Sequence, residues 1–267
     1  MAANNLVRRT PLLVAAGGIY GLACYIGYTS IQKNRQDIQA TVDALNENPG
    51  KSFLNDKNRN QRYEEVASKY DDEIGRDEMV MGITLLRRSL LWFNAKGTVL
   101  EVAAGTGRNI PYYPRGGAVD RVLMMDTSSN MLREANEKIH KRTVDQKPTF
   151  ATVVGDSSNL QQFPDDCFDT VVDTFGLCSY DDPVVVLKEM ARVCKPNGGR
   201  ILLLEHGRSK TWDFITKYLD KHAERHAKNW GCCWNRDLDD IVKQSGLQVE
   251  TLSTWHFGTT YYMVLKL

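Results

Sequence analysis

The sequence predicts an α/β fold in which helices cover both faces of a mostly parallel sheet. Two patterns predict it. From residue 61 onward, short apolar runs typical of buried strands alternate with segments whose apolar residues recur at helical spacing. Acidic residues also end three of the apolar runs, at the edge where parallel sheets commonly bind ligands. With 267 residues, the chain has room for one such domain and a short segment before it.

The expected elements follow one another along the chain. Helices are expected at residues 63–74, 79–93, 128–141, 182–194 and 235–246. Strands are expected at residues 97–103, 121–126, 148–156, 168–175 and 198–207, and the closing stretch 248–267 predicts a hairpin joined by WHFGT. Side chains that accept hydrogen bonds are expected to cap two helices: Ser128 or Ser129 for one and Asn235 for the other.

The N-terminal part of the chain predicts a membrane anchor. Residues 11–31 carry no charge, and 21 residues at ~1.5 Å each span ~31 Å, about the hydrocarbon thickness of a bilayer. We therefore divide the chain into a tail at 1–10, a transmembrane segment at 11–31, a polar linker at 32–60 and a catalytic domain at 61–267.

Alternatives to a retained anchor are a cleaved signal, a buried helix and a mitochondrial targeting signal. The apolar run is longer than a typical signal core and lacks a clear small-residue cleavage site, which favours the anchor. Two basic residues on each side give no orientation. Gly17 and Gly21 have the spacing that permits close helix contact in lipid, so an anchor-mediated dimer is possible.

Charge and cysteine content exclude some classes of protein. The formal net charge is +1, and without the four basic residues before Asp37 the remainder has 30 basic against 33 acidic residues, a net charge of −3. That balance lacks the bulk basic excess of nucleic-acid binding, so we expect no nucleic-acid partner. The six cysteines form no regular framework and are interpreted as free thiols.

A small-residue turn follows the first expected strand and indicates a ligand that approaches the backbone. The turn contains Gly105 and Gly107, and glycine permits both positive φ and close contact. No GK[ST] follows, which excludes a P-loop. Ile110 stands where a dinucleotide fingerprint needs its third glycine, which argues against NAD.

The acids at the strand ends favour a different ligand, S-adenosylmethionine. Glu101 directly before the turn can meet the amino group of a methionine moiety. Asp126 after the second strand can bind a ribose, and Asp156 after the third can bind the exocyclic amine of adenine. A positively charged sulfonium also suits an acidic site better than a pyrophosphate does.

Four motifs in order carry a family resemblance: EVAAGTGRN, MMDTSSNML, VVGDSSNLQQFPDDCFDTVVDTFGLCSYDDP and LKEMARVCKPNGGRILLLEHG. Together they resemble class I S-adenosylmethionine-dependent methyltransferases of the type 11 and ubiquinone/menaquinone-methyltransferase-like group, over about residues 63–267. The resemblance implies a Rossmann-like fold with a seven-stranded sheet that ends in an antiparallel hairpin. It implies these cofactor-binding residues: Tyr70, Glu101, Ala103, Gly105, Gly107, Asp126, Thr127, Met131, Asp156, Ser157 and Thr174.

One position departs from the pattern, because the family often has glycine where Ala103 stands. Alanine there is also known among quinone-type methyltransferases, so we expect a tighter turn with binding retained. A degenerate domain that works without catalysis, as an assembly factor, is the alternative.

Residues 206–264 are similar to the family of fungal mitochondrial inner-membrane methyltransferase-like proteins called oxidase mutant suppressor. This resemblance implies the mitochondrial inner membrane and a single span. Membrane-anchored thiol methyltransferases of the endoplasmic reticulum are similar in layout, including LCS after the fourth strand. The methyl acceptor, a small molecule or a protein, stays open between these alternatives.

Two further groups are candidates for chemistry. His206 follows the fifth strand and can serve as a catalytic base or acceptor-binding group, or simply as a hydrogen-bonded loop histidine. His222 and His226 share a helix face near Cys232 and Cys233, but adjacent cysteines do not match a CxxC zinc geometry. We therefore expect no metal and interpret this segment as a cover on the acceptor side.

Overall fold

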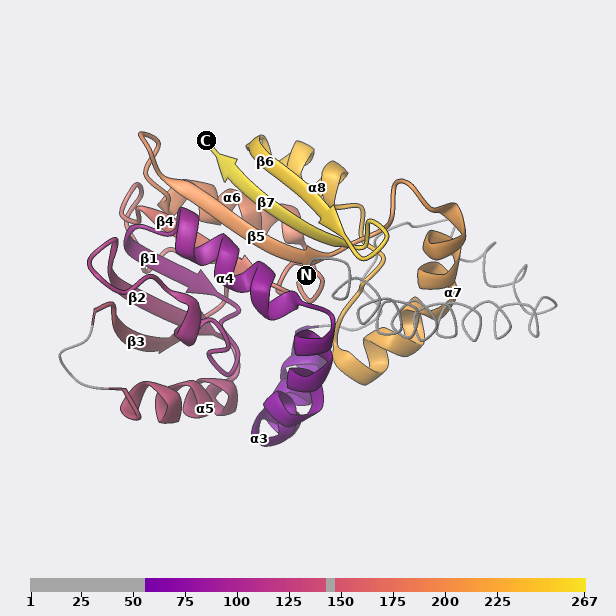
Figure 1. Cartoon of the computed structure of the whole chain (residues 1–267), viewed down its shortest axis with the longest axis horizontal. Coiled ribbons are helices and arrows are strands. Elements are labelled where there is room, and N and C mark those ends of the chain that lie inside the picture. The colour runs from indigo at the N-terminus through magenta and orange to yellow at the C-terminus, as the bar shows by residue number, and fades with distance from the viewer. Residues whose placement is uncertain (1–55, 143–146) are drawn as a thin grey trace, which may run out of the picture. The chain divides into compact units, whose positions relative to one another are not determined.

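The computed structural model describes residues 56–142 and 147–267. Its centre is a seven-stranded sheet with the order β3-β2-β1-β4-β5-β7-β6 (Figure 1). The strands are β1 Gly97–Val102, β2 Val119–Asp126, β3 Thr149–Val154, β4 Thr170–Thr174, β5 Arg200–His206, β6 Gln248–Trp255 and β7 Thr260–Lys266. The first five run parallel, whereas β7 is antiparallel to both β5 and β6. The expected mostly parallel sheet with a terminal antiparallel hairpin is confirmed.

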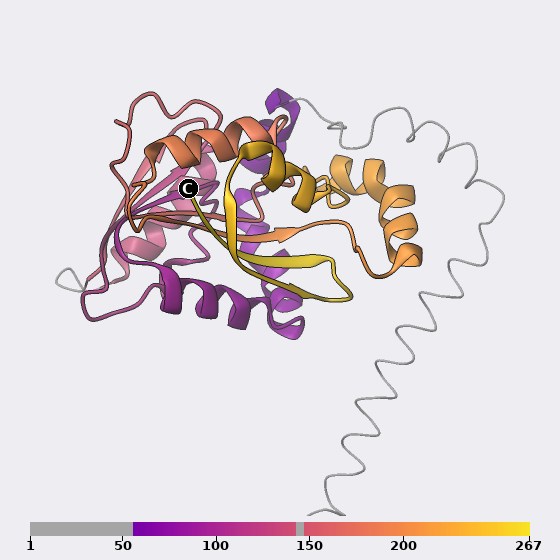
Figure 2. The ribbon, with the colours of Figure 1, turned by 90° about the horizontal axis from the view of Figure 1, so that it is seen from above.

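Helices cover both faces of the sheet (Figure 2). They are α3 Asp56–Val80, α4 Ile83–Asn94, α5 Ser129–His140, α6 Pro183–Val193, α7 Asp213–Trp230 and α8 Leu238–Ser245, with a short 3₁₀ helix η2 at Ile110–Tyr112. One core cluster joins the sheet to α6 and α8, and a second joins its other face to α4 and α5. The central strand β4 is buried at every position, as expected for a strand covered on both sides.

The first two helices differ from their expected bounds. α3 begins at Asp56, inside the range assigned to the linker, and continues to Val80 without the expected gap after residue 74. The break comes instead at Gly82, whose φ of 72° puts it in the left-handed region that favours glycine. The chain therefore turns between α3 and α4 where backbone geometry permits it rather than where the apolar pattern weakens.

Helix caps agree with the sequence at one helix and differ at another. Of the two candidate serines, Ser128 caps α5, because its side chain accepts a hydrogen bond from the backbone N–H of Met131. The prediction that Asn235 caps α8 was wrong. Asp237 accepts from the N–H of Asp240 in that role, whereas the Asn235 side chain donates to Asp220 at 2.9 Å.

The predicted transmembrane segment at 11–31 lies outside the described residues. Within residues 56–142 and 147–267, no helix has both the length and the hydropathy to cross a membrane.

Candidate functional site

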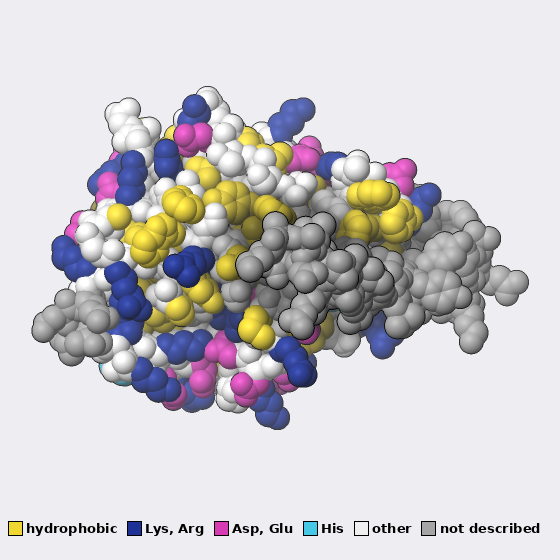
Figure 3. Space-filling model, in the orientation of Figure 1, with side chains coloured by type: hydrophobic (Ala, Val, Ile, Leu, Met, Phe, Trp, Pro, Cys, Tyr) yellow, Lys and Arg dark blue, Asp and Glu magenta, His cyan; other side chains and the backbone are white. Residues whose placement is uncertain are grey.

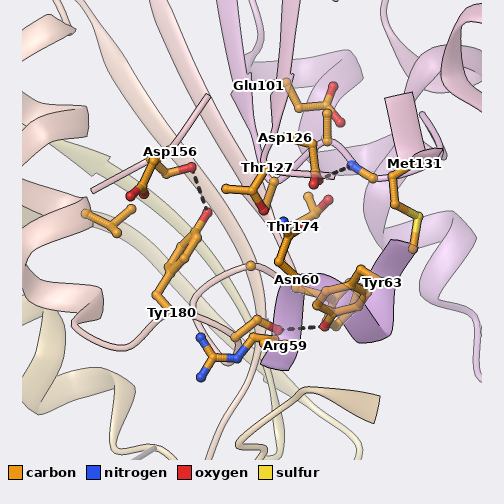
Figure 4. A pocket seen from close by; sticks show the side chains of 18 of the residues that line it. Arg59, Asn60, Tyr63, Glu101, Asp126, Thr127, Met131, Asp156, Thr174 and Tyr180 are labelled. Carbon is orange, nitrogen blue, oxygen red and sulfur yellow. Dashed lines mark hydrogen bonds between the residues drawn. The ribbon is translucent and has the colours of Figure 1, made fainter. Parts of the chain in front are cut away.

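A cavity of about 560 Å³ lies at the carboxyl ends of the parallel strands, next to the point between β1 and β4 where the strand order reverses. The glycine turn, the ends of β2 and β4 and the loop after β3 form one wall, and α3 forms the wall opposite (Figure 4). Of the cofactor-binding residues expected from the sequence, all but Gly107 line it: Tyr70, Glu101, Ala103, Gly105, Asp126, Thr127, Met131, Asp156, Ser157 and Thr174.

Three residues in the turn after β1 have positive φ: Ala103 at 46°, Gly105 at 55° and Gly107 at 77°. The two glycines have different surroundings. A Cβ built on Gly105 would meet no atom within 4 Å, so the backbone here is open to the cavity. A Cβ on Gly107 would come within 2.6 Å of the Ile110 side chain. Gly107 is therefore a packing residue behind the turn, which explains its absence from the cavity lining.

Asp126 at the end of β2 fixes the turn. One carboxylate oxygen accepts from the Gly105 N–H at 2.8 Å, and the other accepts from the Ser128 N–H at 2.9 Å. Burial raises the pKa of Asp126, although these backbone donors act in the opposite direction. The carboxylate thus stands between the glycine turn and the start of α5, where it still has acceptor capacity toward the cavity.

Glu101 is buried at the end of β1. Its carboxylate accepts from Asn109 Nδ2 at 3.0 Å and from the Tyr113 hydroxyl at 2.7 Å. Burial raises the pKa of Glu101 to about 7, against the lowering effect of these donors. A cation in the cavity would favour the ionised form, since an opposite charge nearby lowers a carboxyl pKa.

The third acid, Asp156, is exposed at the rim, and its carboxylate accepts from the Ser158 N–H at 2.8 Å. Ser157 beside it is buried and lies 3.4 Å from the Tyr180 hydroxyl (Figure 4). The three acids are thus spread along the wall in the order of their strands.

Sequence reasoning missed a buried arginine. Arg87 on α4 donates to Thr174 Oγ1 at 2.7 Å and to Asn109 Oδ1 at 3.0 Å, and its other side pairs with Glu78. Its guanidinium also lies 4.9 Å from the centre of the Phe175 ring. The only sequence signal is an arginine on the apolar face of a helix, in LLRRSLL, which buries charge only when a partner is available.

The α3 wall was also largely missed, apart from Tyr70. Tyr63 is hydrogen-bonded to Ser179 at 2.9 Å, and its ring packs edge-on against Tyr70. Glu64, one residue on, accepts from the N–H of Ser129 at 2.7 Å, so α3 is tied to the start of α5. These contacts join segments far apart in sequence and hold α3 across the cavity.

His206, the predicted catalytic residue, lies behind the cavity and does not line it. Its ring centre is 4.5 Å from that of Phe175, which does line the cavity. Burial lowers the pKa of His206 to about 4, so the imidazole is neutral at physiological pH.

The segment with paired histidines and cysteines is packed rather than open. The His226 ring stacks on Trp234 at 3.8 Å between centres, and both Cys232 and Cys233 are buried. Among residues 56–142 and 147–267, no three His, Cys, Asp or Glu side chains are arranged to hold a metal ion.

Comparison with known proteins places this site in a family. Residues 100–202 match a family described as a methyltransferase domain. The chain is 38% identical over 217 residues to the mitochondrial methyltransferase OMS1 of Saccharomyces cerevisiae, covering 76% of this chain but only 45% of the yeast protein. It is 31% identical over 184 residues to the ubiquinone/menaquinone biosynthesis C-methyltransferase UbiE of Marinomonas sp. (strain MWYL1), covering 67% of this chain and 70% of that protein.

The chain belongs to the S-adenosylmethionine-dependent methyltransferases. A solved DhpI–SAH complex shares the fold, with a TM-score of 0.56 and 20% identity over 79% of this chain and 95% of that chain. The family's cofactor is S-adenosylmethionine, and the cavity fits it. The backbone at Gly105 is open, and the carboxylates of Glu101 and Asp126 line the same cavity, where they can accept hydrogen bonds.

Proposed function

We propose that this chain transfers the methyl group of S-adenosylmethionine to an apolar, quinone-like acceptor at the mitochondrial inner membrane, where residues 11–31 anchor it. The observation that carries the proposal is that one cavity gathers the glycine turn and the three acids at the strand ends. The cofactor supplies an electrophilic methyl group, and the protein holds the acceptor in line with it.

The residues have separate roles in this proposal. Glu101 binds the ammonium group of the methionine moiety, Asp126 binds the ribose hydroxyls, and Asp156 binds the adenine amine. Tyr70 and the other residues of the α3 wall cover the cofactor and exclude water. His206 acts on the acceptor side through the Phe175 ring that it contacts. Because it does not line the cavity and a pKa of about 4 makes it a weak base, its role in this proposal is to position that ring.

Two features support the proposed mitochondrial localisation and the proposed quinone-like acceptor. The relative from yeast is named as mitochondrial, and the relative from Marinomonas is named for ubiquinone and menaquinone biosynthesis. An uncharged stretch at 11–31 would keep the domain beside lipid-soluble acceptors of that kind. The alternatives, a thiol methyltransferase of the endoplasmic reticulum and a non-catalytic assembly factor, predict different results in one experiment.

That experiment uses the purified full chain in detergent micelles. Calorimetric titration with S-adenosylmethionine and with its demethylated product should give micromolar binding. Transfer of a radiolabelled methyl group is then compared between a demethylated quinol and a small alkyl thiol. Transfer to the quinol supports the proposal, and transfer to the thiol alone supports the alternative of a thiol methyltransferase. Absence of cofactor binding by folded protein would overturn the proposal in favour of the assembly factor.

Asp126 gives the sharpest variant for the cofactor site. Asp126→Ala should weaken binding of S-adenosylmethionine by about 1.5–3 kcal/mol, roughly 10- to 150-fold, because charged hydrogen bonds are lost. Asp120→Ala is the matched control, since Asp120 lies on the same strand but is exposed and pairs with Lys147. Equal affinity in the two variants would contradict the ribose role of Asp126.

A further inference from the structure

Exposed apolar side chains from three distant segments meet on one surface. Met81 lies between α3 and α4, Trp212 and Phe214 lie at the start of α7, and Trp255 and Phe257 lie at the β6–β7 turn. Their exposed fractions are 50%, 45%, 57%, 51% and 42% in that order. We call these five residues the aromatic tip. Burying such side chains stabilises a protein, so their common exposure indicates an interaction surface.

Specific contacts hold the aromatic tip together. The Nε2 atom of His256 lies 2.7 Å from the Met81 carbonyl oxygen, which ties the hairpin turn to the end of α3. Ser209 donates to the Phe257 carbonyl oxygen at 2.6 Å, and the Trp212 ring centre is 6.2 Å from that of Phe257. The three segments therefore form one continuous surface that specific contacts hold together, rather than three independent loops.

The apolar surface continues along α4. Leu85 and Trp92 follow Met81 at intervals that keep them on one side of the helix, and they are 70% and 45% exposed. The opposite side of α4 is buried in the core through Leu90 and Leu91. Figure 3 shows apolar side chains gathered over α4 and at the start of α7.

The aromatic tip also adjoins the cavity. Phe175 lines the cavity and contacts the ring of His206. His206 is paired with Thr260 across β5 and β7, and the Thr260 hydroxyl lies 2.9 Å from His256 Nδ1 in the hairpin turn. A short series of side-chain and strand-pairing contacts thus leads from the cavity wall to the exposed apolar surface.

We propose that the aromatic tip rests on the surface of a lipid bilayer and faces the acceptor side of the cavity toward the membrane. Tryptophan is enriched at the membrane–water interface, and Trp, Phe and Leu form the apolar face of helices that lie in it. Residues 11–31 form an uncharged stretch of membrane-spanning length, and the chain from 32 to 55 joins it to α3. The proposal rests on the membrane anchor in the proposed function.

Because the anchor tethers the domain to the membrane, a weak contact between the aromatic tip and the bilayer is sufficient to orient the domain. Residues 32–55 can reach at most about 80 Å when fully extended, so an anchored domain stays close to the bilayer. At the resulting effective concentration, insertion of a few aromatic side chains is enough to orient the domain, because the anchor has already paid the cost of association. A lipid-soluble acceptor could then reach the cavity without crossing bulk water.

Tryptophan quenching by lipid tests this proposal. The full chain is reconstituted into phosphatidylcholine vesicles, with and without brominated acyl chains, which quench only tryptophans in contact with lipid. Wild-type emission should be quenched, and the double variant Trp212→Phe/Trp255→Phe should lose most of that quenching. Trp230→Phe is the matched control: Trp230 is 39% exposed at the opposite end of α7, and its removal should leave the quenching in place.

The outcomes separate this proposal from the one on which it rests. Failure of the chain to float with vesicles would refute the anchor. Flotation with no quenching, or with quenching as strong in the double variant as in the wild type, would overturn the bilayer contact alone. Cross-linked dimers in vesicles without quenching would mean that a second copy of the chain covers the aromatic tip, and this result would also overturn the bilayer contact. Cofactor binding, measured on the same samples, should be equal in all variants.

Discussion

At the scale of single residues, Glu101 couples the cofactor site to pH. Burial raises its pKa to about 7, so the free protein holds a proton there that the unfolded chain, with a pKa near 4.5, releases. The stability that Glu101 contributes is therefore present below pH 4.5 and is lost as the pH rises to about 7. A ligand cation that restores the ionised form would remove this proton on binding.

We therefore expect binding of S-adenosylmethionine to release a proton and to strengthen as pH rises, by up to about tenfold per unit and levelling off near pH 7. Calorimetry at pH 6 in two buffers with different ionisation enthalpies measures the proton directly. Glu101→Gln, which cannot ionise, should bind more weakly and without this proton release. An unchanged proton count in that variant would assign the release to another group.

The two glycines of the turn should respond differently to the same substitution. Gly105→Ala places a methyl group in open cavity space at a φ of 55°, so it should weaken cofactor binding while costing roughly 1–2 kcal/mol of stability. Gly107→Ala adds a clash with Ile110 to the same backbone strain and should destabilise the fold more. Urea unfolding and cofactor titration of both variants check this, and the reverse order would contradict it.

The residues that sequence predicted are those whose neighbours are set by chain order. Glu101, Asp126 and Asp156 each end an apolar run, and parallel strands bring such ends to one edge. Arg87 and Asn109 could not be assigned in this way. They are hydrogen-bonded to each other and both contact Thr174, at the end of a third segment, and no local pattern specifies these contacts.

At the scale of elements, a buried ion pair joins α3 to α4. Arg87 donates through Nε and Nη2 to both carboxylate oxygens of Glu78, at 3.2 and 2.8 Å, and Arg108 pairs with the same carboxylate. Although burial acts to raise the pKa of Glu78, the two guanidinium groups hold it below its ordinary value. The turn at Gly82 lies between the two residues, and across it Arg87 reaches the Glu78 carboxylate.

Arg87→Met should lower the free energy of unfolding by about 3 kcal/mol, because removing one partner leaves a buried carboxylate that only Arg108 then compensates. The adjacent Arg88 is exposed, and Arg88→Met should change stability by no more than about 0.5 kcal/mol. Urea denaturation of the two variants makes the comparison. Similar losses in both would mean that the Glu78 pair does not stabilise the α3–α4 bend.

Helix positions were predicted better than helix ends. Apolar periodicity located five of the six described α-helices, and α7 was not among the expected ones. α3 extends through residues 75–78, where the pattern alone predicted a gap. Tertiary contacts at Glu78 support helical structure there, and these are not visible in a local window. The same reason explains α8, where Asp237 and not Asn235 became the cap because Asn235 was engaged by Asp220.

At the scale of the whole molecule, a mostly parallel sheet with a terminal hairpin could be predicted because alternating strands and helices permit few topologies. The cavity wall formed by α3 could not be predicted, because α3 precedes the first strand and is not part of the strand–helix alternation. It crosses the cavity through contacts such as Glu64 with the start of α5 and Tyr63 with Ser179. The cofactor should therefore bind between two parts of the molecule, the sheet edge and α3, and join them.

This arrangement makes cofactor binding a global stabiliser. At a concentration 100 times its dissociation constant, S-adenosylmethionine should add about 2.7 kcal/mol of stability. For a domain of this size that corresponds to a rise in Tm of roughly 5–10 °C. Thermal unfolding of the full chain in detergent, followed by near-UV circular dichroism, measures it. Asp126→Ala should need a proportionally higher concentration for the same rise, whereas an equal concentration of ATP should give none. A rise with ATP as large as that with S-adenosylmethionine would mean that the cavity between the sheet and α3 does not discriminate a sulfonium from a triphosphate.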